Sequence, residues 1–325
     1  MPKNHQTNPN KGHIAVLVQE VLACLQPKPG ESYLDLTAGW GGHAQAVIDL
    51  THAPDKAILV DRDEQAIEVL KNKFAEIRII HQDFLGACQV LAGEGQKFDM
   101  ILADLGVSSP HFDRSERGFT FAVAGPLDMR MDRRQELTAE QLVNEADEAK
   151  LAEIIKNFGE EPRAKIIAKR IIENRPVSDT KQLAEIVANA AKFSARRRKI
   201  HLATRTFQAL RIAVNDELGQ IEQSLPLMGD LLAPGGRLAI ISFHSLEDRL
   251  VKSYFAENAG DRYDAELRLL TKKPQTATPS EIVINPRARS AKLRAVAKIK
   301  TKERAKRNSN ADKGTEYFPR VQSPS

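Results

Sequence analysis

Short apolar runs alternate with amphipathic stretches along the first third of the chain. Between two of these runs, Ala66, Ile67, Leu70 and Phe74 recur at helical spacing. Strands that alternate with helices predict a parallel sheet with helices on both faces and right-handed crossovers. The runs expected to form strands are 33–36, 57–60, 77–81 and 98–102.

The pattern changes after Asp104. Residues 108–134 are rich in Asp, Arg, Gly and Pro without a regular period, which predicts a long functional loop. From 138 to about 191 the apolar positions recur only at helical spacing, so an all-helical insertion is expected. The strand pattern resumes at 238–243 after a Pro-Gly-Gly turn, and residues 281–285 are expected to form a closing strand. The sequence therefore predicts an α/β domain that is split by a helical insertion.

A glycine-rich loop follows the first expected strand. Gly39, Gly41 and Gly42 leave room for backbone N–H groups to approach a ligand at a helix N-terminus. Asp61 ends the next strand about 20 residues further on, where a carboxylate suits hydrogen bonding to ribose hydroxyls. A tight turn and a helix N-cap would explain the same residues. The combined order of strand, loop, helix, strand and acid nevertheless favours binding of a nucleotide moiety.

Composition places the chain among ordinary globular proteins. Its 325 residues are 42% hydrophobic and 28% charged, enough for one large or two moderate domains. No apolar stretch is long enough to span a membrane and no leader is recognised, so a cytoplasmic protein without a membrane role is expected. Cys24 and Cys88 lie in apolar helical contexts, which predicts buried free thiols rather than a metal site or a disulfide.

Positive charge is concentrated in two parts of a chain whose net charge is +5. Residues 285–307 contain ten basic residues and the single acid Glu303, and a second basic run occupies 196–199. Two such clusters favour a polyanionic partner, most simply nucleic acid, although a solvated tail has the same composition. Residues 295–325 are expected to form a basic, flexible C-terminal tail.

Eight separated segments carry long and unusual motifs. They are 35–43, 61–63, 104–109, 117–119, 126–131, 203–212, 241–249 and 285–290. With these motifs the chain resembles the bacterial 16S rRNA (cytosine-N4)-methyltransferases over nearly its whole length. The resemblance implies a class I (Rossmann-like) methyltransferase sheet interrupted by an all-helical inserted domain, with S-adenosylmethionine as cofactor. It also implies methylation of the exocyclic N4 amine of a specific cytidine in the decoding region of 16S rRNA, within the small ribosomal subunit.

The same resemblance implies the residues of the site, without a metal. Asp61 is expected to take the ribose hydroxyls, Phe84 to border the adenine, and Asp104 with His111 to complete the pocket. The position of Asp104 at a strand end suits either a hydrogen bond to the cofactor or a catalytic role, in which it accepts from the target amine and orients its lone pair. A core role for Phe84 and a turn role for Asp104 are the alternatives. His111 stands where glutamine is usual in the family. The cofactor-binding residues implied are Gly41, Gly42, His43, Asp61, Phe84, Asp104 and His111.

The motifs also divide the chain into domains. Residues 1–112 and 207–294 are assigned to a split methyltransferase domain, and 113–206 to a helical insertion for substrate recognition. Aromatic and basic side chains at several positions are candidates for contacting a flipped base or the RNA backbone. For Phe207 and Phe243, core packing is the expected role. These candidates are Phe119, Phe121, Arg130, Arg205, Phe207, Arg211, Phe243 and His244.

Other functions share parts of this pattern. A DNA amino methyltransferase would have the same fold and cofactor, and a non-catalytic RNA-binding ribosome assembly factor would keep the basic clusters. A nicotinamide-dependent oxidoreductase fits less well, because the three glycines lack the spacing of the dinucleotide fingerprint. The sequence does not determine the oligomeric state, and a homodimer is one option.

Overall fold

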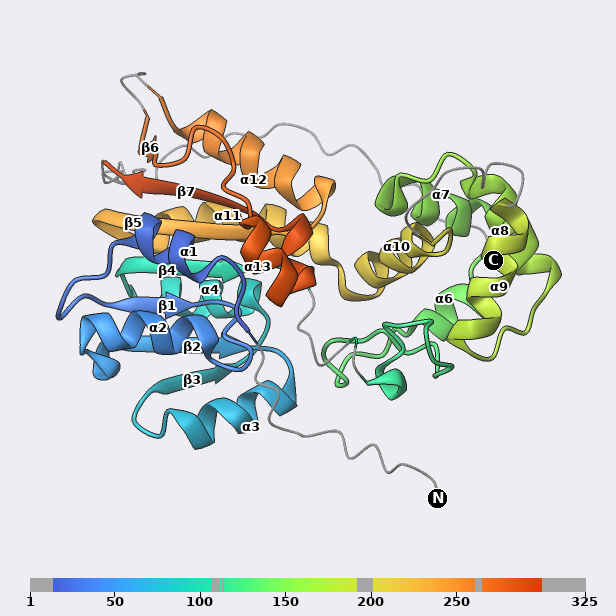
Figure 1. Cartoon of the computed structure of the whole chain (residues 1–325), viewed down its shortest axis with the longest axis horizontal. Coiled ribbons are helices and arrows are strands. Elements are labelled where there is room, and N and C mark those ends of the chain that lie inside the picture. Colours follow the sequence, from blue (N-terminus) through green and yellow to red (C-terminus); the bar gives the residue numbers. More distant parts are fainter. Residues whose placement is uncertain (1–13, 107–111, 113, 192–200, 261–264, 300–325) are drawn as a thin grey trace, which may run out of the picture.

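A seven-stranded sheet lies beside a separate group of helices in the structure, a computed structural model (Figure 1). Residues 14–106, 112, 114–191, 201–260 and 265–299 are described. The strand order is β3-β2-β1-β4-β5-β7-β6, in which β7 is antiparallel to both neighbours and the other pairs are parallel. The strands are β1 (Tyr33–Asp35), β2 (Ala57–Asp61), β3 (Arg78–His81), β4 (Phe98–Asp104), β5 (Leu232–Ser242), β6 (Leu267–Leu269) and β7 (Lys292–Lys298).

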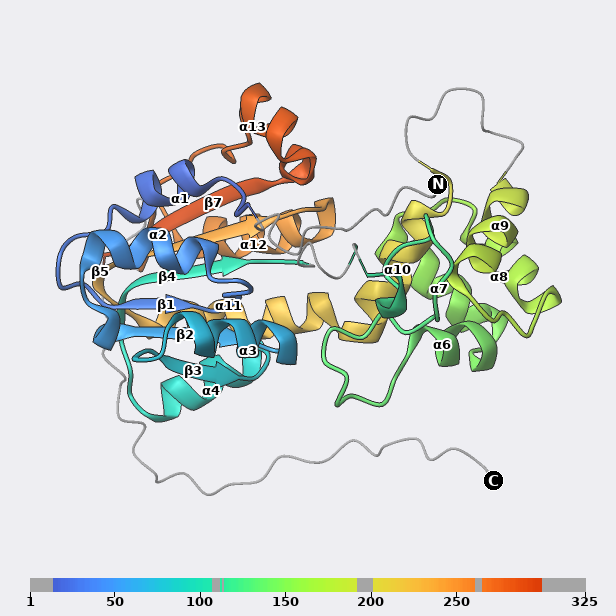
Figure 2. The ribbon, with the colours of Figure 1, turned by 60° about the horizontal axis from the view of Figure 1, so that its bottom comes forward.

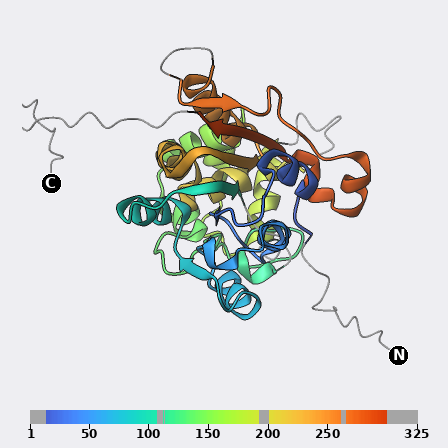
Figure 3. The ribbon, with the colours of Figure 1, turned by 90° about the vertical axis from the view of Figure 1, so that its left-hand side faces the viewer.

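Helices cover both faces of the sheet, as predicted (Figure 3). One face carries α1 (Val18–Leu25), α2 (Gly42–Thr51) and α3 (Glu64–Lys73), and the other carries α4 (Phe84–Gly93), α11 (Glu217–Leu231) and α12 (Ser245–Asn258). Tyr33 and Leu34 contact opposite cores because successive side chains of a strand point to opposite faces. Cys24 and Cys88 are buried free thiols in these cores, which confirms the prediction.

The insertion between β4 and β5 is helical, as predicted, and β4 points toward it (Figure 2). Its helices are α6 (Ala139–Glu145), α7 (Glu148–Gly159), α8 (Ala164–Glu173), α9 (Thr180–Ala191) and α10 (Thr204–Asn215). They bury a third core, to which Phe207, Leu210 and Val214 of α10 belong. The boundary predicted at 206 therefore cuts through α10, and the insertion extends to Asn215. No described helix is long and apolar enough to cross a membrane.

The prediction of a closing strand at 281–285 is wrong, because the helix α13 (Pro279–Ile284) occupies this place. The Thr278 side chain accepts from the N–H of Glu281, and Pro279 lies in the first turn, where its missing N–H removes no helical hydrogen bond. The β-branched run that suggested a strand is not packed in a sheet, since Val283 is 81% exposed. The other short elements are the 3₁₀ turns η1 (Pro54–Lys56), η2 (Ser115–Arg117) and η4 (Pro286–Ser290).

The closing strand is β7, which the sequence assigned in part to a flexible tail. It pairs with β5 and β6 and reaches Lys298, so a tail boundary at 295 is wrong. Lys292 and Arg294 form ion pairs with Asp248, and the Lys298 ammonium donates to the carbonyl of Gly229 over 2.6 Å. Part of the basic run therefore holds the sheet together. The remaining tail, 300–325, and the basic run at 196–199 lie outside the described residues.

We expect the chain to tolerate a stop after Ile299 and not after Ser290. The first stop leaves every described strand in place, whereas the second removes β7 from between β5 and β6 and exposes two strand edges. Thermal unfolding followed by circular dichroism should show a cooperative transition close to the parent's for the first variant and none for the second. Equal stability of the two truncated chains would contradict the place assigned to β7.

Candidate active site

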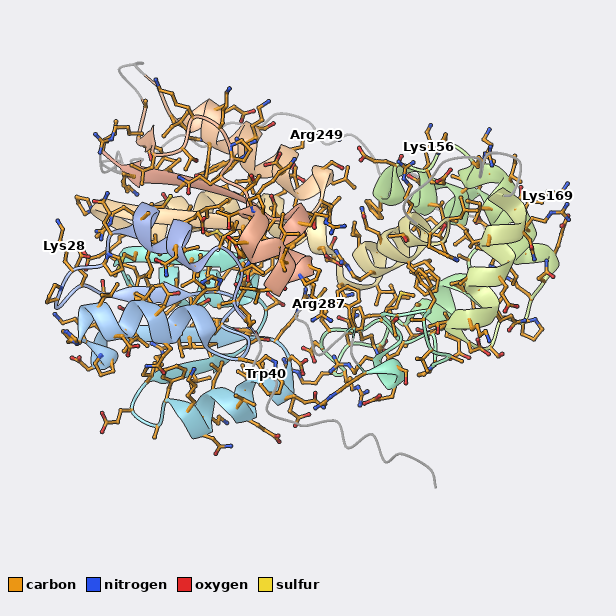
Figure 4. The ribbon with its side chains drawn as sticks, viewed as in Figure 1. Lys28, Trp40, Lys156, Lys169, Arg249 and Arg287 are labelled. Atoms are coloured by element: carbon orange, nitrogen blue, oxygen red, sulfur yellow. The ribbon has the colours of Figure 1, made fainter. Side chains whose placement is uncertain are left out.

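A pocket lies at the edge of the sheet where β1, β2, β4 and β5 end. It runs from Phe84 at the start of α4 to Phe243, which follows β5. Trp40 and Arg287 also line it, and both lie on the side of the sheet domain that faces the insertion (Figure 4). This edge of an open parallel sheet is where ligands bind, and five of the predicted residues line the pocket there: Gly42, His43, Asp61, Phe84 and Asp104.

The glycine loop shapes one wall of this pocket. Gly42 and His43 line the wall, but Gly41 is not part of it. A Cβ on Gly41 would lie 2.4 Å from the Phe74 ring, and its φ of 71° is left-handed. The need for glycine at 41 is thus explained by packing and backbone conformation. Its role as a ligand contact stays a prediction.

Asp61 presents a fixed carboxylate at the end of β2. Its Oδ2 accepts from the N–H of Gly39 and its Oδ1 from the N–H of Asp63, both over 2.8 Å. The side chain lines the pocket next to the glycine loop. Two backbone donors therefore hold the acid in the position that the sequence predicted for it.

Phe84 lies in the core and also lines the pocket, and its contact with the adenine stays a prediction. It is 7% exposed and belongs to the core that Leu36 and Ala87 share, and it also lines the pocket. The helix N-cap Asp83 places it there, since its carboxylate accepts from the N–H of Gly86 over 2.7 Å. The predicted cofactor residue His111 lies outside the described residues.

A buried polar cluster lies where β1 and β4 end. The Nε2 atom of His43 is 3.6 Å from Oδ2 of Asp104, and the Tyr33 hydroxyl donates to Oδ2 of Asp35 over 2.8 Å. Within the described residues, both ring nitrogens of His43 and Oδ1 of Asp104 are buried without a hydrogen-bond partner. Buried polar atoms of this kind need a ligand or water to satisfy them. Asp35, which the sequence placed only in a motif, belongs to this cluster but does not line the pocket.

The charges in this cluster influence one another. Burial raises the pKa of Asp35 to about 6, although the imidazole of His43 and the hydroxyl of Tyr33 oppose it. Burial lowers the pKa of His43, but Asp104 and Asp35 outweigh this effect and the pKa is raised overall. The imidazolium is therefore favoured between two carboxyl groups.

The β5 side of the pocket contains two acids that the sequence did not single out. Glu247 is fully buried, and its Oε2 accepts from the N–H groups of Phe243 and His244 over 2.7 and 3.2 Å. Glu217 accepts two 2.7 Å hydrogen bonds from Arg211. The signal for Glu247 was available, because it stands three residues after the N-cap His244 in a capping box. Glu217 follows a left-handed turn that has no comparable signal.

Ligand atoms of Glu217, His244 and Glu247 lie within 4.8 Å of one another. Arg211 already neutralises Glu217, and the Nε2 atom of His244 is 3.2 Å from Oε1 of Glu247. Burial acts to raise the pKa of Glu247, but the His244 side chain, Arg211 and the N–H of Phe243 outweigh this effect and lower the pKa overall. This group is therefore internally paired, and Arg211 is committed to Glu217 rather than available to a phosphate.

Several candidates for RNA contact are used inside the insertion. Arg130 forms an ion pair with Asp128 over 2.7 Å and donates to the carbonyls of Arg133 and Gln135. Phe121 packs edge-on against Phe207 at 4.8 Å between ring centroids, and Phe207 is 5% exposed. The expected core role of Phe207 is confirmed. Phe119 is also buried in this core, and the side chain of Phe243 is part of the pocket wall.

Known proteins of similar sequence agree with this architecture. The model of the MraW methylase family matches residues 10–299. The chain is 44% identical to the Ribosomal RNA small subunit methyltransferase H of Heliobacterium modesticaldum, covering 89% of this chain and 99% of that protein. It is 49% identical to the protein of the same name from Picosynechococcus, over 87% and 95% of the two chains. The chain therefore belongs to the MraW methylase family, which confirms the predicted methyltransferase class, fold class and S-adenosylmethionine cofactor.

Proposed function

We propose that this methyltransferase modifies the exocyclic N4 amine of a cytidine in the decoding region of 16S rRNA, within the small ribosomal subunit. The observation that carries the proposal is one continuous pocket, which connects Asp61 on β2 to Asp104 on β4 and Phe243 after β5. Relatives that align over nearly their whole length are named for small-subunit ribosomal RNA. A cofactor on the β2 side leaves the β5 side for the target base.

The residues of the pocket fit S-adenosylmethionine. Asp61 would hold the ribose hydroxyls and Phe84 would border the adenine. The amino-acid end of the cofactor carries an ammonium and a carboxylate, and the unpartnered atoms of Asp104 and His43 supply an acceptor and a donor of matching charge. Gly42 leaves the wall open beside them, since a Cβ there would lie 2.9 Å from Ala15. Gly41 supports this wall from behind.

The cofactor supplies an electrophilic methyl group on a sulfonium. The amine of cytosine is a poor nucleophile because its lone pair is delocalised into the ring, so the enzyme must orient it and take up a proton. Asp104 lies between the proposed cofactor and base sites and is the proposed catalytic residue. Its carboxylate would accept from the amine and direct the lone pair, an effect that can supply several kcal/mol. Burial acts to lower the pKa of the His43 imidazole, which lies 3.6 Å from this carboxylate, but the interaction with Asp104 raises the pKa overall.

The insertion is the proposed recognition domain for the RNA. Lys156 on α7 and Lys169 on α8 are exposed on the insertion, and Lys169 lies on the part that is away from the sheet (Figure 4). Exposed lysines neutralise phosphates without reading sequence, and this fits a domain that positions a large RNA. Arg249, by contrast, is paired with Glu160 of the insertion over 2.9 Å.

Transfer of a labelled methyl group tests the proposed function. The enzyme is incubated with labelled cofactor and small ribosomal subunits, naked 16S rRNA or duplex DNA, and the products are digested to nucleosides. We expect N4-methylcytidine in the small subunits. Label in DNA alone would overturn the proposal in favour of a DNA methyltransferase, and cofactor binding without any transfer would indicate a non-catalytic assembly factor.

We expect Asp61→Asn to weaken S-adenosylhomocysteine binding by about 10-fold or more. The amide keeps an acceptor for a backbone N–H but loses the charge, and a hydrogen bond to a charged group contributes about 1.5–3 kcal/mol. Calorimetric titration measures the affinity, and Asp49→Asn on the exposed side of α2 is the matched control. Equal affinity of the parent and the Asp61 variant would contradict the ribose role.

We expect Asp104→Asn to lower kcat by about 100-fold or more, with a smaller change in cofactor affinity. The amide has no negative charge with which to orient the amine or take up its proton. Single-turnover methylation of small subunits at saturating cofactor measures this loss, and Asp55→Asn on η1 serves as control. A variant with the parent's rate would exclude a catalytic role for Asp104.

We expect Asp35→Asn to flatten the dependence of stability on pH between about 4 and 6. Because the pKa of Asp35 is raised on folding, its protonated form stabilises the fold below the unfolded value, and this contribution is lost as pH rises through about 6. The difference from the ordinary value of 3.8 corresponds to about 3 kcal/mol. Urea titrations at several pH values measure it. An identical pH profile for the variant would show that Asp35 does not titrate in this way.

A further inference from the structure

Arg117 is a buried cation for which the proposed reaction has no use. Its side chain is only 3% exposed although it belongs to the irregular segment before the insertion helices. Its Nη1 donates to Oδ2 of Asp63 over 3.2 Å, and its Nη2 donates to the carbonyls of Arg130 and Met131 over 3.1 and 3.0 Å. A guanidinium is expensive to bury unless such partners surround it. This one joins the turn after β2 to a segment of the insertion.

On the sheet side, the partner of Arg117 is fixed to the proposed ribose acid. The N–H of Asp63 donates to Oδ1 of Asp61, and the Oδ1 atom of Asp63 accepts from the N–H of Gln65 at the start of α3. One carboxylate oxygen of Asp63 therefore caps α3, and the other accepts a hydrogen bond from Arg117. A ligand that fixes the position of Asp61 therefore also affects the position of Asp63, whose carboxylate accepts from Arg117.

On the insertion side, Arg117 holds a strained segment against the pocket. Met129 has a φ of 58°, a left-handed conformation that is uncommon for a residue with a side chain. Asn215, which ends α10, receives a hydrogen bond from the N–H of Met131 and donates to the carbonyl of Met129, both over 2.8 Å. Met131 lines the pocket, and its sulfur contacts the guanidinium of Arg62. Strain of this kind persists only where surrounding contacts enforce it.

We propose that Arg117 is a positioning residue that couples cofactor binding to the position of the pocket segment 129–131, and so to RNA binding. The inference rests on the proposed site, in which Asp61 takes the ribose. A cofactor held by Asp61 stabilises the Asp63 carboxylate in the orientation that Arg117 needs, and Arg117 then holds Met131, which lines the pocket and belongs to the insertion proposed to bind the RNA. Coupling between two ligands is reciprocal, so bound RNA tightens cofactor binding by the same factor.

The test measures binding of S-adenosylhomocysteine, which cannot react, with and without saturating small ribosomal subunits. We expect the parent to bind it at least about 5-fold more tightly when the subunits are present. Arg117→Lys keeps the positive charge but cannot reach Asp63 and both carbonyls together, so the ratio should fall close to one. Affinity for S-adenosylhomocysteine alone should change far less. A purely structural arginine would lower stability without changing this ratio.

Two further variants separate the outcomes. Asp63→Asn keeps the acceptor for α3 and removes the charge opposite Arg117, so it should lose the coupling even if Arg117→Lys folds poorly. Arg134→Gln breaks an exposed ion pair with Asp132 in the same segment and should keep the parent's ratio. A parent without coupling, or Arg117 and Asp63 variants that retain it, would overturn the inference. Failure of the parent to bind S-adenosylhomocysteine at all would instead refute the proposed cofactor site.

Discussion

Parallel pairing of β4 with β5 is the interaction on which the rest of the molecule depends. The two strands are hydrogen-bonded neighbours, with Ile101 beside Leu238 and Asp104 beside Ile241, although the whole insertion separates them in sequence. Closing so long a connection costs entropy that only a buried strand pair and a folded insertion can offset. Both ends of the insertion consequently meet the sheet at its ligand-binding edge. The same pairing that completes the sheet brings the helical domain to the pocket.

The sequence predicted correctly those parts of the fold in which the local hydrophobic pattern agrees with the position of the segment in the sheet. The first four strands are short apolar runs with helices between them, and Asp61 and Asp104 end two of these strands. The failures involve the last part of the chain. In residues 292–298 the basic side chains stand at the even positions 292, 294 and 298 among apolar residues, which fits a strand, but their charge suggested a solvated tail. Only the structure shows that Lys292 and Arg294 form ion pairs with Asp248, and that Lys298 donates to the carbonyl of Gly229.

The site shows a second limit of prediction from sequence. Residues attached to strand ends could be found because the position of a strand end follows from the pattern. Glu217 and Arg117 could not be assigned, since Glu217 follows a turn of irregular backbone and Arg117 acts through a partner far away in sequence, whereas Glu247 carried a capping-box signal that was not used. Arg211 illustrates the consequence, because the sequence left either a phosphate or an acidic neighbour open as its partner, and the fold pairs it with Glu217. The sequence shows that a residue is charged, but not which residue neutralises it.

The turn after β2 explains how one short motif can serve two domains. Asp61 and Asp63 are two residues apart, and in an extended strand they would point to the same side. The chain instead turns into α3 at Asp63, so Asp61 stays at the pocket while Asp63 reaches the insertion through Arg117. The hydrogen bond between the two aspartates makes their positions interdependent. The proposed cofactor site and the insertion are thus connected through one turn.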